Sequence, residues 1–164
     1  MFEPNSVFKP KATHWLAPVR AALADAEDTR GLIVRFPSYR PDLVETMARS
    51  LGLVFVDFRK TCMAPLGFAA AKIPLGELTR VAIDAMERGS GVVLHNCEAL
   101  LGLHAEERRA EWFSRLVSPG WEKPFVAPVT LFADDLPAKS PRVVELDPDR
   151  LPAENLLSRL AGLR

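Results

Sequence analysis

The sequence has few of the residues that mark secreted, membrane or disulfide-bonded proteins. Of 164 residues only two are cysteines, Cys62 and Cys97, and they do not form a CxxC pair. Two cysteines are too few for a disulfide framework and suit a reducing compartment. No apolar run approaches the roughly 18 residues of a membrane helix, and the N-terminal MFEPNSVFKPK lacks the apolar core of a secretory signal. We therefore expect a cytoplasmic protein with no membrane partner.

An excess of charge of either sign is also lacking. Lys and Arg together number 21, as do Asp and Glu, so the formal net charge is zero. A dedicated nucleic-acid binder usually has a basic excess or a basic stripe. Cations at 108, 109, 115 and 123 are interspersed with glutamates at 106, 107, 111 and 122, which favours a solvated helix face. Any link to nucleic acid is expected to be indirect.

The pattern of apolar residues predicts a single α/β domain over residues 1–164. The length allows one well-packed domain. Short apolar runs predict five strands, over 32–36, 53–58, 92–94, 129–132 and 142–146. Helices are predicted over 14–27, 41–51, 75–87, 105–117 and 152–160, with an extended segment over 1–12 and an irregular connection over 59–74. Strands alternating with helices predict a three-layer fold in which helices flank a five-stranded, mostly parallel sheet.

The loop after the first predicted strand, RFPSYRPD, lacks both glycine and lysine. Ligand sites in open parallel sheets form at the carboxyl ends of strands. A phosphate cradle there needs free backbone N–H groups, glycines that admit the phosphates, and a lysine. The residues at this nucleotide-loop position are Arg35, Pro37, Ser38, Tyr39 and Arg40. The prolines remove backbone N–H donors. The two arginines could contact an anion, but the loop has no cradle to hold it, so we expect no nucleotide triphosphate here.

The third predicted strand ends in His95-Asn96-Cys97-Glu98. In nucleotide hydrolases the corresponding strand ends in an acid that holds magnesium, followed by a glutamate that polarises water. Here His95 occupies the place of the acid, and Glu98 is the one acidic residue left nearby. A histidine and a cysteine alone do not make a zinc site. We expect Cys97 in the core, His95 as a satisfied histidine, and neither a metal nor a cofactor.

Acidic residues also follow two other strands. Asp134 lies where a sensor residue often lies in nucleotide hydrolases, although Asp134-Asp135 before Leu136-Pro137 is better explained as a turn pair. Asp57 ends the second strand, and an ion pair with Arg59 or Lys60 is the simpler account of it. No GxSxG motif is present, which excludes the nucleophile elbow of α/β-hydrolases.

Residues 31–160 resemble the core of P-loop NTPases of the AAA+/RecA-like type in their order of elements. LIVRF with its loop and helix resembles the nucleotide-loop unit, VVLHNCEALL the magnesium-strand unit, and VTLFADD the sensor strand. NCEALL is similar to the N-x-E-x-L-hydrophobic pattern of the small P-loop subunit of BREX phage-defence systems. The loop glycines, the lysine and the magnesium-side aspartate are absent together. The resemblance therefore implies a pseudo-ATPase.

Two functions from different classes follow from these observations. The first is a non-catalytic pseudo-ATPase subunit in a bacterial antiviral defence system, acting through a protein partner or as a homo-oligomer. Its candidate interfaces are Met63–Ile73 and Val117–Pro128, the latter exposing or half-exposing Trp121 and Phe125. Both segments could instead pack on the protein's own core.

The second function is a small-anion or nucleotide-binding domain, or an enzyme, with a non-standard site at the carboxyl ends of the strands. Its candidate residues are Arg35, Ser38, Tyr39, Arg40, Asp57, Glu98 and Asp134.

Overall fold

A sheet of five parallel strands forms the centre of the molecule. The computed structural model describes residues 14–25, 28–154 and 160. The strands are arranged in the order β2-β3-β4-β1-β5, and every neighbouring pair is parallel. They are β1 (Gly31–Arg35), β2 (Val54–Asp57), β3 (Val92–His95), β4 (Phe125–Val129) and β5 (Val143–Glu145). The predicted α/β class is confirmed.

Helices follow the strands in the alternation that the sequence predicts. The α-helices are α1 (Ala17–Ala24), α2 (Pro41–Leu51), α3 (Gly76–Glu87), α4 (Cys97–Leu101) and α5 (Glu106–Leu116). Shorter helical turns are η1 (His14–Leu16), η2 (Arg59–Met63), η3 (Ala64–Lys72), η4 (Ala133–Asp135) and η5 (Pro148–Arg150). Among the described residues, no helix is long and apolar enough to cross a bilayer.

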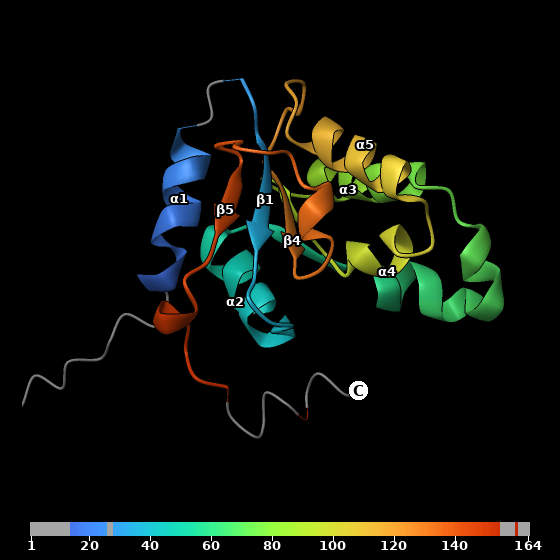
Figure 1. The fold of residues 1–164 in the computed structure, drawn as a ribbon, viewed down its shortest axis with the longest axis horizontal. Helices are drawn as coiled ribbons and strands as arrows, with labels where there is room; N and C mark the ends of the chain where they lie inside the picture. The colour runs from blue at the N-terminus through green and yellow to red at the C-terminus, as the bar shows by residue number, and fades with distance from the viewer. Residues whose placement is uncertain (1–13, 26–27, 155–159, 161–164) are drawn as a thin grey trace, which may run out of the picture.

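The helices cover both faces of the sheet and make three layers (Figure 1). Successive strand residues point to opposite faces, so Leu32 and Val34 pack with α1 and α2, whereas Ile33 packs with α3 and α5. Strands buried on both faces read as continuous apolar runs. That pattern explains why the sequence predicts the strands without any polar alternation.

Helix α2 shows how local signals set its two ends. Pro41 begins the helix, where a missing N–H costs little. Gly52 ends it at φ +68°, and its N–H bonds the carbonyls of Ala48 and Arg49. The predicted bounds of this helix are confirmed.

The fourth strand lies earlier than predicted, over Phe125–Val129 instead of 129–132. Pro128 falls inside it, and proline disfavours a central strand. The backbone groups of successive residues in a strand point alternately to its two neighbours. The Phe125 N–H donates to the Arg30 carbonyl, on the side of β1, and the Pro124 carbonyl accepts from the Val92 N–H, on the side of β3. Pro128, four residues after Pro124, therefore also faces β3. Pairing with β3 covers only Phe125 and Val126, so Pro128 lies beyond it and lacks no ladder bond.

Two further segments differ from the prediction or lie outside it. The predicted irregular connection over 59–74 is mostly helical, formed by η2 and η3 with a break at Gly67. The predicted extended segment 1–12 lies outside the described residues, as does most of the predicted helix over 152–160.

Candidate functional site

The carboxyl edge of the sheet is closed by its own side chains. The loops after β1, β3 and β4 meet there around a cavity of about 10 Å³. That volume is close to what one water molecule needs. The lining residues are Phe36, Tyr39, Arg40, Val44, His95, Asn96, Glu98, Pro128 and Thr130. The cavity at the place where the AAA+/RecA-like resemblance would put phosphates is therefore smaller than a phosphate group.

A chain of hydrogen bonds joins three of the loops at this edge. The Tyr39 hydroxyl donates to Asn96 Oδ1 at 3.0 Å, and Asn96 Nδ2 donates to Asp57 Oδ1 at 3.0 Å. Asp57 also accepts from the backbone N–H of Lys60 at 3.1 Å. The carboxylate of Asp57 thus binds two N–H donors instead of the predicted ion pair with Arg59 or Lys60.

Asn96 holds this chain in place through its backbone. It adopts φ +61° and ψ +26°, a left-handed conformation that asparagine tolerates better than most side chains. This single residue turns the chain from β3 into α4 while its amide spans the distance between Tyr39 and Asp57.

His95 lies between two aromatic rings. Tyr39 stacks on it with centroids 5.8 Å apart, and Phe55 with centroids 5.7 Å apart. The imidazole is almost completely buried, and burial lowers its pKa, although the charge of Asp57 works in the opposite direction. Among the described residues Nε2 has no hydrogen-bond partner, so the prediction of a fully satisfied histidine is wrong for this nitrogen.

Glu98 ties α4 to the loop after β4. Its carboxylate accepts from the backbone N–H of Thr130 at 2.9 Å and from that of Leu131. Burial raises the pKa of this carboxyl, while the two N–H donors oppose the change. Cys97 beside it is fully buried, as predicted, and burial raises the pKa of its thiol. Both residues hold the fold together at this edge.

Both arginines of the β1 loop are engaged elsewhere. Arg35 pairs with Glu145 on the neighbouring strand β5. Arg40 is buried, contacts the carboxylate of Asp42 at 2.9 and 3.1 Å, and donates to the Pro152 carbonyl at 2.8 Å. Burial tends to raise the pKa of Asp42, but hydrogen bonding and the charge of Arg40 hold it below its usual value.

The second functional hypothesis therefore finds only part of its cluster. Tyr39 is linked to Asp57 through Asn96, and Glu98 lines the same cavity. The guanidinium groups that would neutralise an anion are paired with carboxylates, and Pro37 and Ser38 are exposed on the outer surface of the loop.

Beyond β4 the buried acid is Asp135, while Asp134, the sensor-like candidate, is exposed. Asp135 pairs with Arg109 Nε at 2.7 Å. Arg109 also donates to the His104 carbonyl at 2.7 Å, and its guanidinium lies 4.4 Å from the centre of the Phe132 ring. Sequence reasoning assigned Arg109 to a solvated helix face and missed this pair, because nothing local shows that η4 packs against α5.

The segment Val117–Pro128 packs mainly on the core. Phe125 is fully buried in β4, so the expectation of exposure at this residue is wrong. Trp121 is partly buried, and its indole N–H donates to the Leu116 carbonyl at 2.9 Å. The Trp121 and Phe125 rings meet edge to face at 5.0 Å. These contacts favour the core explanation for both aromatics.

The other candidate interface, Met63–Ile73, has two sides. Met63, Ala70 and Ile73 are buried, whereas Leu66 is 51% exposed and Phe68 is completely exposed. We call residues 59–72, which form η2 and η3, the η2–η3 arm. It projects at one end of the molecule, in green at the right of Figure 1.

Comparisons with known proteins add no relative to this description: no family model, no curated protein and no solved structure matches the chain. The described residues also contain no group of three or more histidine, cysteine, aspartate or glutamate side chains placed to hold a metal ion. Chemically, the strand ends offer one neutral imidazole, one buried carboxylate bound to backbone amides, and a closed amide–carboxylate chain.

Proposed function

We propose that this protein is a non-catalytic, P-loop NTPase-like (pseudo-ATPase) subunit that acts by binding another protein, in a bacterial antiviral defence system. The observation that carries the proposal is the closed carboxyl edge of the sheet. Tyr39, His95 and Asn96 fill the region in which a nucleotide hydrolase holds its phosphates.

The order of the strands supports the scaffold part of the proposal. The three units matched in the sequence are the nucleotide-loop strand, the sensor strand and the magnesium strand. They correspond to β1, β4 and β3, which are neighbours in the sheet. A working site of this type would combine the carboxyl ends of those strands, and here the same ends meet without the cradle, the lysine or the magnesium-side acid.

The defence setting rests on the similarity of Asn96–Leu101 to the BREX pattern. In this chain the pattern has a structural use, because Asn96 makes the left-handed turn and Glu98 binds two backbone amides after β4. A chain without an open site at its strand ends can still act through its surface, and the η2–η3 arm, with Leu66 and Phe68, is an exposed apolar part of that surface.

A thermal-shift series tests the proposal against the small-anion alternative. The purified chain is melted with ATP, GTP, pyrophosphate and inorganic phosphate, each with and without Mg²⁺. A ligand at about 100 times its Kd adds about 2.7 kcal/mol of stability, which is a rise of roughly 5–11 °C for a domain of this size. We expect no rise with any of them. A rise with phosphate and pyrophosphate alone would favour the anion-binding function, and a rise with ATP would refute the pseudo-ATPase.

A further inference from the structure

The η2–η3 arm presents apolar side chains to solvent on a rigid base. Its inner residues Met63 and Ala70 are packed in the core, so the arm is anchored without help from Phe68. Gly67 adopts φ +55° and ψ −127°, a conformation that glycine reaches and other residues rarely do. The break at Gly67 separates Leu66 from Phe68 and leaves both side chains in water. A large exposed aromatic next to an exposed leucine is typical of an interaction surface.

A groove of about 550 Å³ runs between the arm and α3. Its size lies within the roughly 300–1,000 Å³ of sites that bind ligands or side chains. Most of its lining is apolar: Phe58, Cys62, Pro65, Leu66, Ala69, Ile73 and Pro74. The charged lining residues are Lys72, Glu77 and Arg80.

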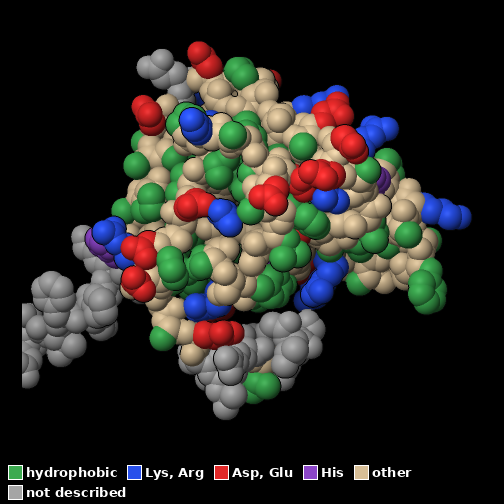
Figure 2. Space-filling model, viewed as in Figure 1, with side chains coloured by type: hydrophobic (Ala, Val, Ile, Leu, Met, Phe, Trp, Pro, Cys, Tyr) green, Lys and Arg blue, Asp and Glu red, His purple; other side chains and the backbone are tan. Residues whose placement is uncertain are grey.

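The arm carries positive charge only, and Lys72 is the cation that it contributes to the lining of the groove. Residues 59–72 contain Arg59, Lys60 and Lys72 and no acidic residue, in a chain whose net charge is zero. Neither lysine side chain makes an ion pair with any residue that the structure describes. Figure 2 shows hydrophobic and basic side chains projecting together at the end of the molecule where η3 lies.

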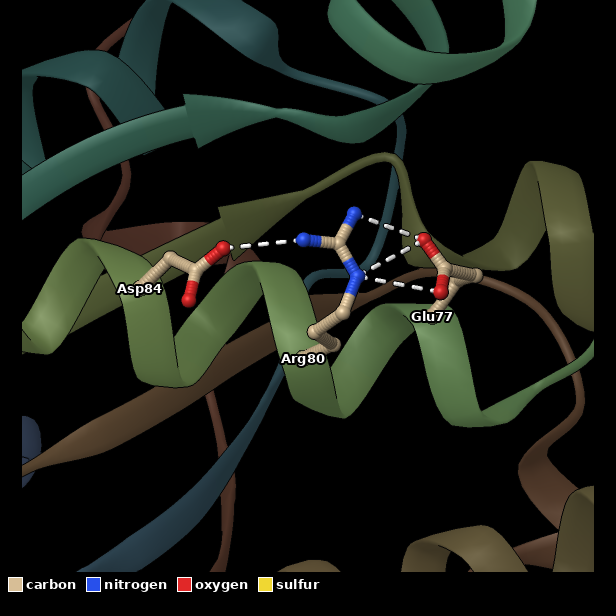
Figure 3. A network of polar contacts seen from close by, with 3 residues as sticks. All are labelled: Glu77, Arg80 and Asp84. Atoms are coloured by element: carbon tan, nitrogen blue, oxygen red, sulfur yellow. Dashed lines mark hydrogen bonds and ion pairs between the residues drawn. The ribbon is translucent and has the colours of Figure 1, made fainter.

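The acids on the α3 side are already used. Arg80 donates to Glu77 at 2.7 and 3.0 Å and to Asp84 at 2.9 Å, so both carboxylates are held along α3 (Figure 3). Glu77, the acid in the lining of the groove, is thus paired with Arg80, whereas Lys72 makes no ion pair with any described residue. An occupant of the groove would therefore meet apolar walls and the unpaired ammonium group of Lys72.

We propose that the groove binds an acidic amphipathic segment of a partner protein, with bulky apolar side chains on one face and Asp or Glu beside them. The apolar face would enter the groove along Leu66 and extend to the exposed Phe68 of the arm, and the carboxylates would face Lys72. A second copy of this chain fits less well, because pairing two arms brings like charges together. This inference rests on the proposed function, since it names the partner that a non-catalytic subunit would bind.

Two synthetic amphipathic peptides test the proposal. They share one Leu/Phe face and are about 18 residues long, and they differ only in carrying Glu or Lys on the other face. Binding to the full chain is followed by fluorescence anisotropy. We expect the acidic peptide to bind at least about tenfold more tightly than the basic one, and to weaken in about 0.5 M NaCl. Equal binding of both peptides, or none of the acidic one, would overturn the proposal.

Variants locate the binding to the groove. Phe68→Ser and Lys72→Glu should each weaken the acidic peptide by at least about fivefold. Their matched controls are Leu131→Ser, at another exposed large apolar residue, and Arg108→Glu, at another exposed cation, and neither should change binding. Equal losses in variants and controls would show that the peptide binds elsewhere. Melting curves of all four verify that each variant is folded.

Sedimentation of the same samples tests the competing occupant. A dimer that Phe68→Ser dissociates would assign the groove to a second copy and refute the acidic partner. The thermal-shift series with ATP separates failure of this inference from failure of the proposed function. If neither ATP nor the acidic peptide binds, the proposed groove interaction is refuted and the pseudo-ATPase proposal stands. If ATP binds, the pseudo-ATPase proposal is refuted whatever the peptide does.

Discussion

The pair of Arg109 and Asp135 predicts a large effect of substitution at Asp135 and almost none at the adjacent Asp134. Asp135→Asn removes the charge from a carboxylate whose side chain is 4% exposed, while Arg109 stays 17% exposed beside it. Asp134→Asn makes the same chemical change at an exposed position. Removing one partner of a buried ion pair costs about 3–5 kcal/mol, because the other charge is left without compensation. An exposed substitution usually stays within about 0.5 kcal/mol.

We place Asp135→Asn near the lower end of that range, at about 3 kcal/mol. The asparagine can still accept a hydrogen bond from Nε, and Arg109 keeps its bond to the His104 carbonyl and its position over Phe132. Arg109→Met should cost a similar amount, because it strands the buried carboxylate. The double variant Arg109→Met/Asp135→Asn should then cost less than the sum of the two by about 1–3 kcal/mol.

The assay is urea unfolding followed by tryptophan fluorescence and circular dichroism. A lower midpoint with an unchanged slope shows that the free energy of unfolding has fallen while the surface exposed on unfolding has not changed. Equal effects of Asp134→Asn and Asp135→Asn, or a loss below about 1 kcal/mol for Asp135→Asn, would refute the assignment of Asp135 as the buried partner.

Three more predictions follow from single contacts. Gly31→Ala places a Cβ 1.6 Å from the Leu116 carbonyl oxygen, so unfolding should become easier by about 3 kcal/mol, whereas Gly76→Ala, with nothing within 4 Å, should stay within about 1 kcal/mol in the same urea assay. Because burial lowers the pKa of His95 in the folded state, the unfolded chain binds a proton that the folded chain does not, and stability should fall from pH 7 towards 5 by up to about 1.4 kcal/mol per unit. His95→Phe should reduce that dependence of stability on pH. Comparing the variant with the parent at each pH cancels the contribution of Glu98, whose raised pKa acts with the opposite sign. Equal slopes for variant and parent would contradict a neutral imidazole in the folded state. Tyr39→Phe keeps the ring on His95 but loses the bond to Asn96, so it should cost no more than about 1.5 kcal/mol, and a larger loss by urea unfolding would show that the ring stack depends on that bond.

The fold could be predicted from the sequence because its signals are local. Each strand is a short apolar run, and α2 has a proline at its start and a glycine at its end. The fourth strand lies before its predicted place and includes Pro128, which a central strand disfavours. Only the pairing with β3, which ends at Val126, shows that the missing N–H of Pro128 costs no ladder bond. The helical nature of η2 and η3 was missed because the segment contains no heptad or 3.6-residue stripe and is interrupted at Gly67.

The site was predictable as a list of residues but not as a set of contacts. That the β1 loop cannot cradle phosphate follows from its prolines and missing lysine. That Tyr39 covers His95 and reaches Asp57 through Asn96 requires β2 and β3 to be neighbours, which no local pattern states. Arg40 is a similar case, because its acceptor at Pro152 lies 112 residues along the chain.

The most direct test of the closed strand ends is a calorimetric titration of the purified chain with ATP, with and without Mg²⁺. We expect no heat of binding at about millimolar ATP, because the cavity of about 10 Å³ is smaller than a phosphate group and both arginines of the β1 loop are paired. A saturable isotherm would contradict it. Such binding would require Tyr39 to leave His95 and Asn96, and the protein would then have to be described as a nucleotide-binding domain with a site that opens.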